Sequence, residues 1–136
     1  MRITAAVRNT LDGHRATVST AGASQAVPVR AKTVGRGSGV NGGEFLMLAL
    51  ATCYCNDLFR EAARLGIPLD SVEVEAQADF GAIGLAATNI RYRACVESSA
   101  PPSDIEELLR QTDAVAEIQN TMRAGVGVSR VPWQSA

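Results

Sequence analysis

Hydrophobic and polar residues alternate strictly over two stretches in the middle of the chain, residues 71–80 and 88–97. This period of two is typical of a half-buried β-strand. A glycine-containing turn at residues 81–84 separates the stretches, so we expect an antiparallel hairpin. Glutamate and arginine side chains share its polar face, where they could pair across the strands.

Two strand-favouring runs also open the chain, residues 2–8 and 14–20, with Asp12-Gly13 before the second run. An Asp-Gly pair between two such runs is a strong hairpin signal. A third run, residues 25–33, follows a turn of small residues, and Pro28 indicates that this strand lies at a sheet edge or contains a bulge. The sequence therefore predicts an N-terminal antiparallel meander.

A long helix is predicted over residues 44–65, with Asn41 as its N-terminal cap and Gly66 as its left-handed C-terminal cap. Residues 45–55 are apolar on every side, whereas residues 56–64 carry a polar face. Its charged members are Asp57, Arg60, Glu61 and Arg64. The apolar half is too short to span a bilayer and must be covered by protein. Because a domain of 136 residues has difficulty surrounding a helix, we expect a second subunit.

The C-terminal third predicts another helix that begins near Pro101, with Ser103 as its cap and Glu106 completing a capping box. Apolar residues continue at helical spacing to Met122, with a break predicted near Thr112 and Asp113. A final strand, residues 125–131, is expected to return to the sheet. This order of elements predicts one α+β domain over residues 1–136.

Charge and cysteine content limit the function classes. The chain has 13 basic and 14 acidic residues without a run of either sign, which gives no support to nucleic-acid or membrane binding. The N-terminus lacks the pattern of a secretory signal, so we expect a cytoplasmic protein. The 3 cysteines are then expected to be thiols. With His14 as the single histidine, we expect neither a bound metal nor another cofactor.

Cys53 lies in the apolar half of the long helix, where a cysteine is either a small core residue or, if activated, a reactive thiol. Cys55 is two residues further on, about 200° around the helix, so the pair cannot form a disulfide within it. Cys95 lies on the charged face of its strand. Glu44 is about 13 Å from Cys53 along the helix axis, so it could act only by holding an arginine that reaches the thiol. The available cations are Arg36 in the glycine-rich loop and Arg8 and Arg30 on the first strands.

Residues 39–54, GVNGGEFLMLALATCY, resemble the helix signature of the OsmC/Ohr family, in which an apolar helix leads to an Ala-Cys-aromatic motif. The resemblance continues through residues 60–67, REAARLGI, and residues 69–75, LDSVEVE. It implies an α+β fold in which antiparallel sheets pack on two long central helices of an intertwined homodimer. It also implies reduction of organic hydroperoxides or hydrogen peroxide, with Cys53 as the peroxidatic cysteine.

The chain departs from this family pattern at two places. The family's second cysteine would fall near Val115 or Ala116, where no cysteine is present. Many members have Asn-Pro-Glu where this chain has Asn41, two glycines and Glu44. The resemblance thus implies catalytic roles for Cys53 and Glu44, and for Arg36 as the first choice among the arginines.

Two functions follow from the resemblance. The first is a thiol-dependent peroxidase, with Cys55 or Cys95 of a second subunit, or an external thiol, resolving the oxidised Cys53. The second is an inactive protein of the same dimeric fold that binds a small apolar ligand at the subunit interface.

Overall fold

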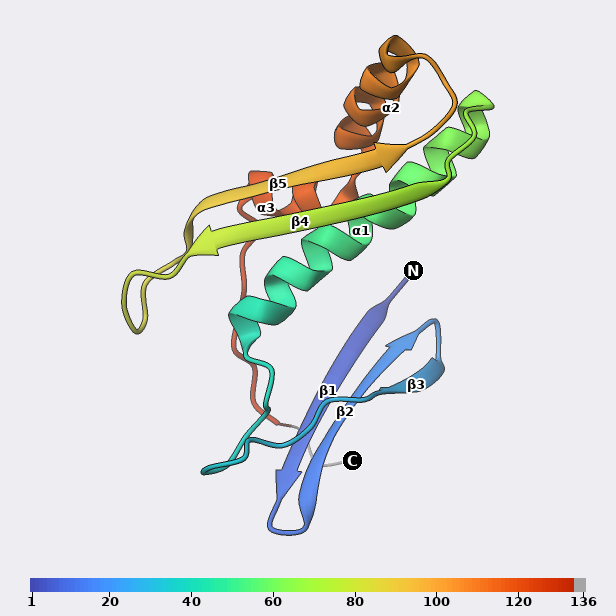
Figure 1. Cartoon of the computed structure of the whole chain (residues 1–136). Helices are drawn as coiled ribbons and strands as arrows, with labels where there is room; N and C mark the ends of the chain where they lie inside the picture. The colour runs from blue at the N-terminus through green and yellow to red at the C-terminus, as the bar shows by residue number, and fades with distance from the viewer. Residues whose placement is uncertain (134–136) are drawn as a thin grey trace. The chain divides into compact units, whose positions relative to one another are not determined.

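The computed structural model describes residues 1–133, which form an α+β protein with two antiparallel sheets and three helices (Figure 1). The chain divides into two compact units, Met1–Phe45 and Leu46–Ala136. The expectation of one domain over residues 1–136 therefore stays a prediction.

The N-terminal unit contains the predicted three-stranded meander. Its strands are β1 (Ile3–Thr10), β2 (Gly13–Thr20) and β3 (Ala23–Val27), paired in the order β1-β2-β3. The hairpin expected at Asp12-Gly13 is confirmed, since Thr10 pairs with Gly13 across the turn. β3 is an edge strand that ends just before Pro28, because proline cannot donate to a strand ladder. It is shorter than predicted, and beyond it Ala31 makes only an isolated bridge to Ser38.

The helix α1 (Gly42–Leu65) has the predicted caps at both ends. The backbone N–H of Glu44 donates to Asn41 Oδ1 over 2.9 Å, and the N–H of Asn41 donates to Glu44 Oε2 over 2.7 Å. This reciprocal pair is a capping box. At the other end Gly66 has a φ of +69°, and the N–H of Ile67 donates to the carbonyl of Ala62 over 2.9 Å. Together these features form a Schellman motif.

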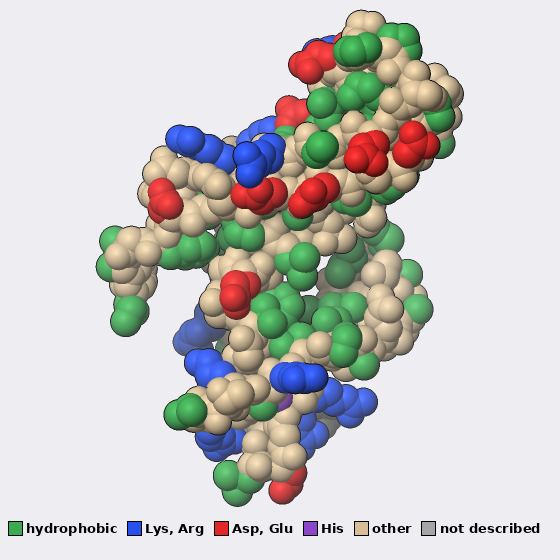
Figure 2. Space-filling model, viewed as in Figure 1, with side chains coloured by type: hydrophobic (Ala, Val, Ile, Leu, Met, Phe, Trp, Pro, Cys, Tyr) green, Lys and Arg blue, Asp and Glu red, His purple; other side chains and the backbone are tan. Residues whose placement is uncertain are grey.

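The predicted central hairpin consists of β4 (Ser71–Asp79) and β5 (Thr88–Glu97). Glu75 pairs with Arg93 in the register, and the Arg93 guanidinium donates to the Glu75 carboxylate over 2.6 and 3.0 Å. Acidic and basic side chains gather along the exposed face of this hairpin (Figure 2). The alternating pattern therefore gave both the strands and their charged face correctly.

The core of the C-terminal unit lies between α1, the apolar face of the hairpin and the helices that follow. Val72, Val74, Tyr92 and other half-buried residues of the hairpin pack against it. Its buried members are Tyr54, Leu58, Ala62, Leu108 and Ala116. By contrast, Ala16 is the one buried hydrophobic residue of the N-terminal unit.

The C-terminal helices are α2 (Pro102–Val115) and α3 (Glu117–Ala124). The predicted capping box at Ser103 is wrong, because Pro101 is the N-cap residue and no side chain caps α2. Pro102 starts the helix instead, which suits a residue with a fixed φ and no N–H. The predicted break is present but lies later, at Ala116, whose extended ψ of 105° separates the two helices.

The predicted final strand is wrong for the described residues. Gly125 ends α3 with a φ of +59°, and residues 126–133 form neither helix nor strand. A strand needs a neighbour to accept its hydrogen bonds, and no described strand pairs with this segment. Val126, Val128 and Val131 are 63, 98 and 75% exposed. Among the described residues no helix has the length and apolar character needed to cross a membrane.

Candidate functional site

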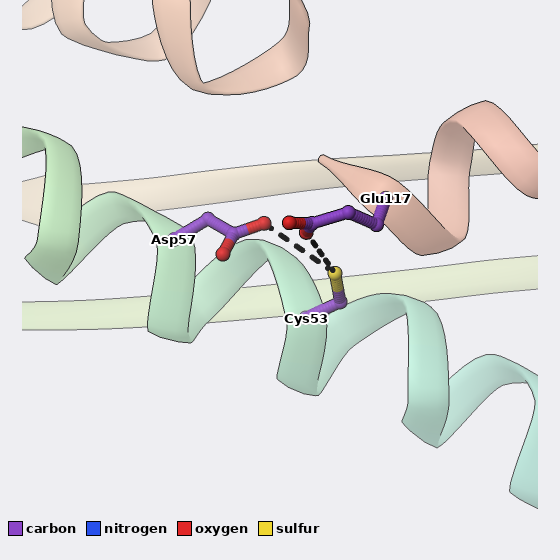
Figure 3. A group of neighbouring side chains, drawn as sticks. All are labelled: Cys53, Asp57 and Glu117. Atoms are coloured by element: carbon purple, nitrogen blue, oxygen red, sulfur yellow. Dashed lines mark hydrogen bonds between the residues drawn. The ribbon is translucent and has the colours of Figure 1, made fainter. Parts of the chain in front are cut away.

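Cys53 lies in a small cluster with two carboxylates, Asp57 and Glu117 (Figure 3). Asp57 is four residues after Cys53 on α1, so both side chains lie on one face of that helix. Glu117 is the first residue of α3. The Cys53 thiol is 3.4 Å from Asp57 Oδ2, to which it donates a hydrogen bond, and 3.9 Å from Glu117 Oε2.

The predicted polar face of α1 is turned inward at this point. Asp57 is 5% and Glu61 7% exposed. Burying a carboxylate is costly unless a cation and hydrogen bonds accompany it. Arg60 donates to Asp57 Oδ1 over 2.7 Å and to Glu61 Oε1 over 3.2 Å, and Arg64 donates to Glu61 Oε2 over 2.6 Å. The hydrogen bond from Arg64 is the largest cause that holds the pKa of the Glu61 carboxyl below its usual value, and the hydrogen bond from Arg60 is the second.

The two carboxylates beside Cys53 divide their oxygens between the sulfur and Arg60. Asp57 Oδ2 and Glu117 Oε2 face the sulfur. Asp57 Oδ1 and Glu117 Oε1 lie 2.7 and 4.0 Å from the Arg60 guanidinium. Arg60 therefore orients the two carboxylates and neutralises part of their charge. Among the described residues, no contact joins Arg60 to the Cys53 thiol.

The environment of Cys53 favours the protonated thiol. Partial burial is the largest cause that raises the pKa of this thiol. The backbone amide of Ile118, in the first turn of α3, lowers the pKa, but Asp57 and Glu117 raise it further. The net direction is upward, which is opposite to the shift that activates a nucleophilic cysteine.

The same cluster has the donor atoms of a metal site. The Cys53 sulfur and one oxygen from each of Asp57 and Glu117 lie within 4.8 Å of one another. Thiolate and carboxylate groups can act as zinc ligands. From the sequence we expected no metal site, because His14 is the single histidine. Arg60 already supplies positive charge to both carboxylates, so the geometry does not require an ion.

The predicted partners Arg36 and Glu44 belong to the N-terminal unit, where each has hydrogen-bond partners of its own. Arg36 Nε donates to Asn9 Oδ1 over 3.2 Å within the N-terminal unit. The Glu44 carboxylate accepts from the backbone of Asn41 in the capping box. Their assignment as catalytic residues stays a prediction.

The other sequence-predicted site residues are also separate from the cluster. Cys55 is half-buried and Cys95 is exposed on β5, opposite Glu73, and all three cysteines are free thiols. Val115 is 43% exposed and Ala116 is fully buried. The residue of this segment that faces Cys53 is Glu117, a position the sequence did not single out. Helical spacing from Cys53 could have indicated Asp57, but no local pattern points to Glu117.

Comparison with known proteins agrees with the resemblance in the sequence. The OsmC-like protein family matches residues 35–129. No curated protein sequence matches the chain.

Solved structures have the same fold at low sequence identity. The OsmC like protein from Mycoplasma pneumoniae is 17% identical with a TM-score of 0.63, over 90% of this chain and 86% of that chain. An organic hydroperoxide resistance protein from Elizabethkingia anophelis is 15% identical with a TM-score of 0.63, over 90% and 89% of the two chains. Another from Legionella pneumophila is 13% identical with a TM-score of 0.59, over 90% of each chain. The family match extends over most of the sequence, and the chain therefore belongs to the OsmC-like protein family.

Proposed function

We propose that the chain is a thiol-dependent peroxidase that reduces organic hydroperoxides through Cys53. The Cys53 thiolate attacks the outer oxygen of the hydroperoxide, the O–O bond breaks, and an alcohol leaves after protonation. Sulfur is oxidised by two electrons to a sulfenic acid while the hydroperoxide is reduced. Solved relatives described as organic hydroperoxide resistance proteins support this chemistry for the fold.

The observation that carries the proposal is the hydrogen bond from the Cys53 thiol to Asp57 Oδ2. A carboxylate in this position can accept the thiol proton as the sulfur attacks, which is general base catalysis. Arg60, 2.7 Å from the other oxygen of Asp57, orients that carboxylate. The raised pKa of Cys53 makes such a proton acceptor necessary, because few thiolates form at neutral pH.

An external thiol completes the cycle in this proposal. Among the described residues, no second sulfur is in hydrogen-bond contact with Cys53, and all three cysteines are free thiols. A small thiol attacks the sulfenic acid to give a mixed disulfide and water, and a second thiol then releases the reduced enzyme as a small-molecule disulfide forms.

We further propose that two copies of the chain form a homodimer. The apolar half of α1 is incompletely covered, with Leu48 56% exposed. In the N-terminal unit Ile3 and Val7 are 64 and 65% exposed. Exposed apolar side chains in both units are typical of a protein that forms an interface with another chain. A second copy would cover it and could bring Arg36 and Glu44 to Cys53.

The raised pKa of Cys53 favours a second candidate, a catalytically inactive protein that binds a small apolar molecule. The C-terminal unit has a pocket of mainly apolar lining that would suit such a ligand. Its lining residues are Leu50, Ile90, Tyr92, Gln119, Met122 and Arg123.

The two functions are separated by a turnover assay. Sub-stoichiometric protein with dithiothreitol should consume cumene hydroperoxide, and Cys53→Ser should abolish that consumption. Cys95→Ser is the matched control, because its exposed thiol lies on β5 away from the cluster. If the unmutated protein consumes no peroxide with dithiothreitol or dihydrolipoamide, the peroxidase proposal is wrong and the binding function is favoured.

A further inference from the structure

The charge around Cys53 is unbalanced. Two carboxylates, from Asp57 and Glu117, turn oxygens toward the sulfur at 3.4 and 3.9 Å. One guanidinium, from Arg60, lies against their other oxygens at 2.7 and 4.0 Å. The cluster therefore carries one excess negative charge before the thiol ionises.

The two carboxylates differ in their exposure. The Asp57 side chain is 7% exposed, whereas the Glu117 side chain is 71% exposed. Glu117 thus lies on the solvent side of the sulfur, at the start of α3 (Figure 3). A reagent that reaches the sulfur from solvent must come within a few ångströms of this carboxylate.

A negative charge on such a reagent is repelled by Glu117 at close range, while a neutral reagent of similar size is not. At about 4 Å the repulsion between unit charges is strong enough to change a rate several-fold even in water, and salt weakens it. Asp57 adds to this repulsion, and Arg60 offsets only one of the two charges.

We propose that Glu117 is a specificity-determining residue that makes Cys53 discriminate against anionic reagents. Resting on the proposed peroxidase function, this assigns uncharged alkyl hydroperoxides as the oxidising substrates and neutral or cationic small thiols as the reductants. Hydroperoxides and thiols that carry a carboxylate are poor substrates. The selection acts on the approach of the reagent and does not require Glu117 to take part in proton transfer.

The charge selection is tested without any enzymatic turnover by alkylation of the full-length protein. Iodoacetate and iodoacetamide both react with the thiolate, but only iodoacetate is negatively charged. Any change that Glu117→Gln makes in the thiolate fraction affects both rates equally, so the ratio of the two rates reports the charge at the site. Mass spectrometry of the peptide that contains Cys53 gives both rates.

The expected result is that the iodoacetate to iodoacetamide rate ratio at Cys53 rises about threefold or more in Glu117→Gln at low salt. High salt should reduce this difference. The ratio at Cys95 serves as an internal control and should not change. Glu106→Gln, which removes an exposed carboxylate from α2, should leave the Cys53 ratio as it is. Equal ratios in the unmutated protein and Glu117→Gln would overturn the inference.

A second measurement uses turnover with thiols of different charge. Cysteamine and 2-mercaptoethanol should support faster peroxide consumption than 3-mercaptopropionate, and Glu117→Gln should reduce the disadvantage of the anionic thiol. Consumption that is independent of thiol charge in both proteins would contradict the inference and leave the peroxidase function intact. Absence of consumption with every thiol would contradict the peroxidase function, whereas the alkylation ratio would still decide the charge selection.

Discussion

The sulfur of Cys53 and the carboxylate of Glu117 lie 3.9 Å apart, although 64 residues separate them in the sequence. The break between α2 and α3 at Ala116 produces this proximity, because it places the first turn of α3 beside the middle of α1. The second cysteine of the family pattern would fall near this point, at Val115 or Ala116. A carboxylate faces Cys53 instead, which changes both the ionisation of the thiol and the way in which it could be recycled.

The first prediction concerns the pH dependence of Cys53. Burial and the two carboxylates raise the pKa of its thiol, so the fraction of reactive thiolate increases only at alkaline pH. The rate of alkylation by iodoacetamide should have its midpoint above the value of about 8.5 for an unperturbed cysteine. Asp57→Asn should lower the midpoint of this titration, because it removes the charge on a group 3.4 Å from the sulfur.

The control for this titration is the same protein denatured in urea, in which Cys53 loses its surroundings. Glu106→Gln, on an exposed part of α2, should leave the midpoint of the folded protein unchanged. A folded midpoint at or below that of the denatured protein would show that a cation activates the thiol. Such a result would favour a role for Arg36 of a second copy.

The sequence predicts elements well where local interactions determine them. The capping box of Asn41 and Glu44 and the left-handed Gly66 each involve neighbouring residues, and both are present. Strict alternation predicted the β4 and β5 hairpin and its face of glutamates and arginines, on which the structure pairs Glu75 with Arg93. The cap at Ser103 was misassigned because the two prolines before it start the helix two residues earlier, with Pro101 as the N-cap.

The cluster at Cys53 was less accessible to sequence reasoning because it depends on tertiary structure. Asp57 follows Cys53 by one helical turn, yet its position in a charged stretch suggested exposure to solvent. Burial of that carboxylate depends on the packing of α1 against the rest of its unit and on pairing with Arg60. Glu117 reaches the sulfur only through the break at Ala116, whose exact place no residue pattern specified.

A second prediction concerns the core of the C-terminal unit. Leu108 on α2 is fully buried in the cluster that includes Tyr54 and Leu58. Leu108→Ala should lower the free energy of unfolding by about 2–5 kcal/mol, because it removes buried methyl groups and leaves a cavity. Val115→Ala is the control, since Val115 is 43% exposed, and it should change stability much less. Urea denaturation at one protein concentration measures both, and equal losses would contradict the assigned core.

A third prediction concerns the end of α1. Gly66 has a φ of +69° with open space where a Cβ would lie, so a substitution there meets backbone strain and no steric clash. Gly66→Ala should destabilise the protein by about 1 kcal/mol in urea denaturation. Gly81→Ala is the matched control, because Gly81 has equal space and no positive φ. If the two variants are equally stable, the left-handed cap does not form in solution.

The last prediction concerns the exposed apolar surface of α1 and the proposed homodimer. Leu48 is 56% exposed in the single chain, and a second copy would remove it from water. Leu48→Asp places a charge at that position, where burial without a partner is costly, so it should shift the protein from dimer to monomer in sedimentation equilibrium. Ile83→Asp is the control, because Ile83 is fully exposed in the turn between β4 and β5, and it should leave the dimer intact. A monomer in the unmutated protein at micromolar concentration would contradict the homodimer, and Arg36 and Glu44 of a second copy could then not act on Cys53.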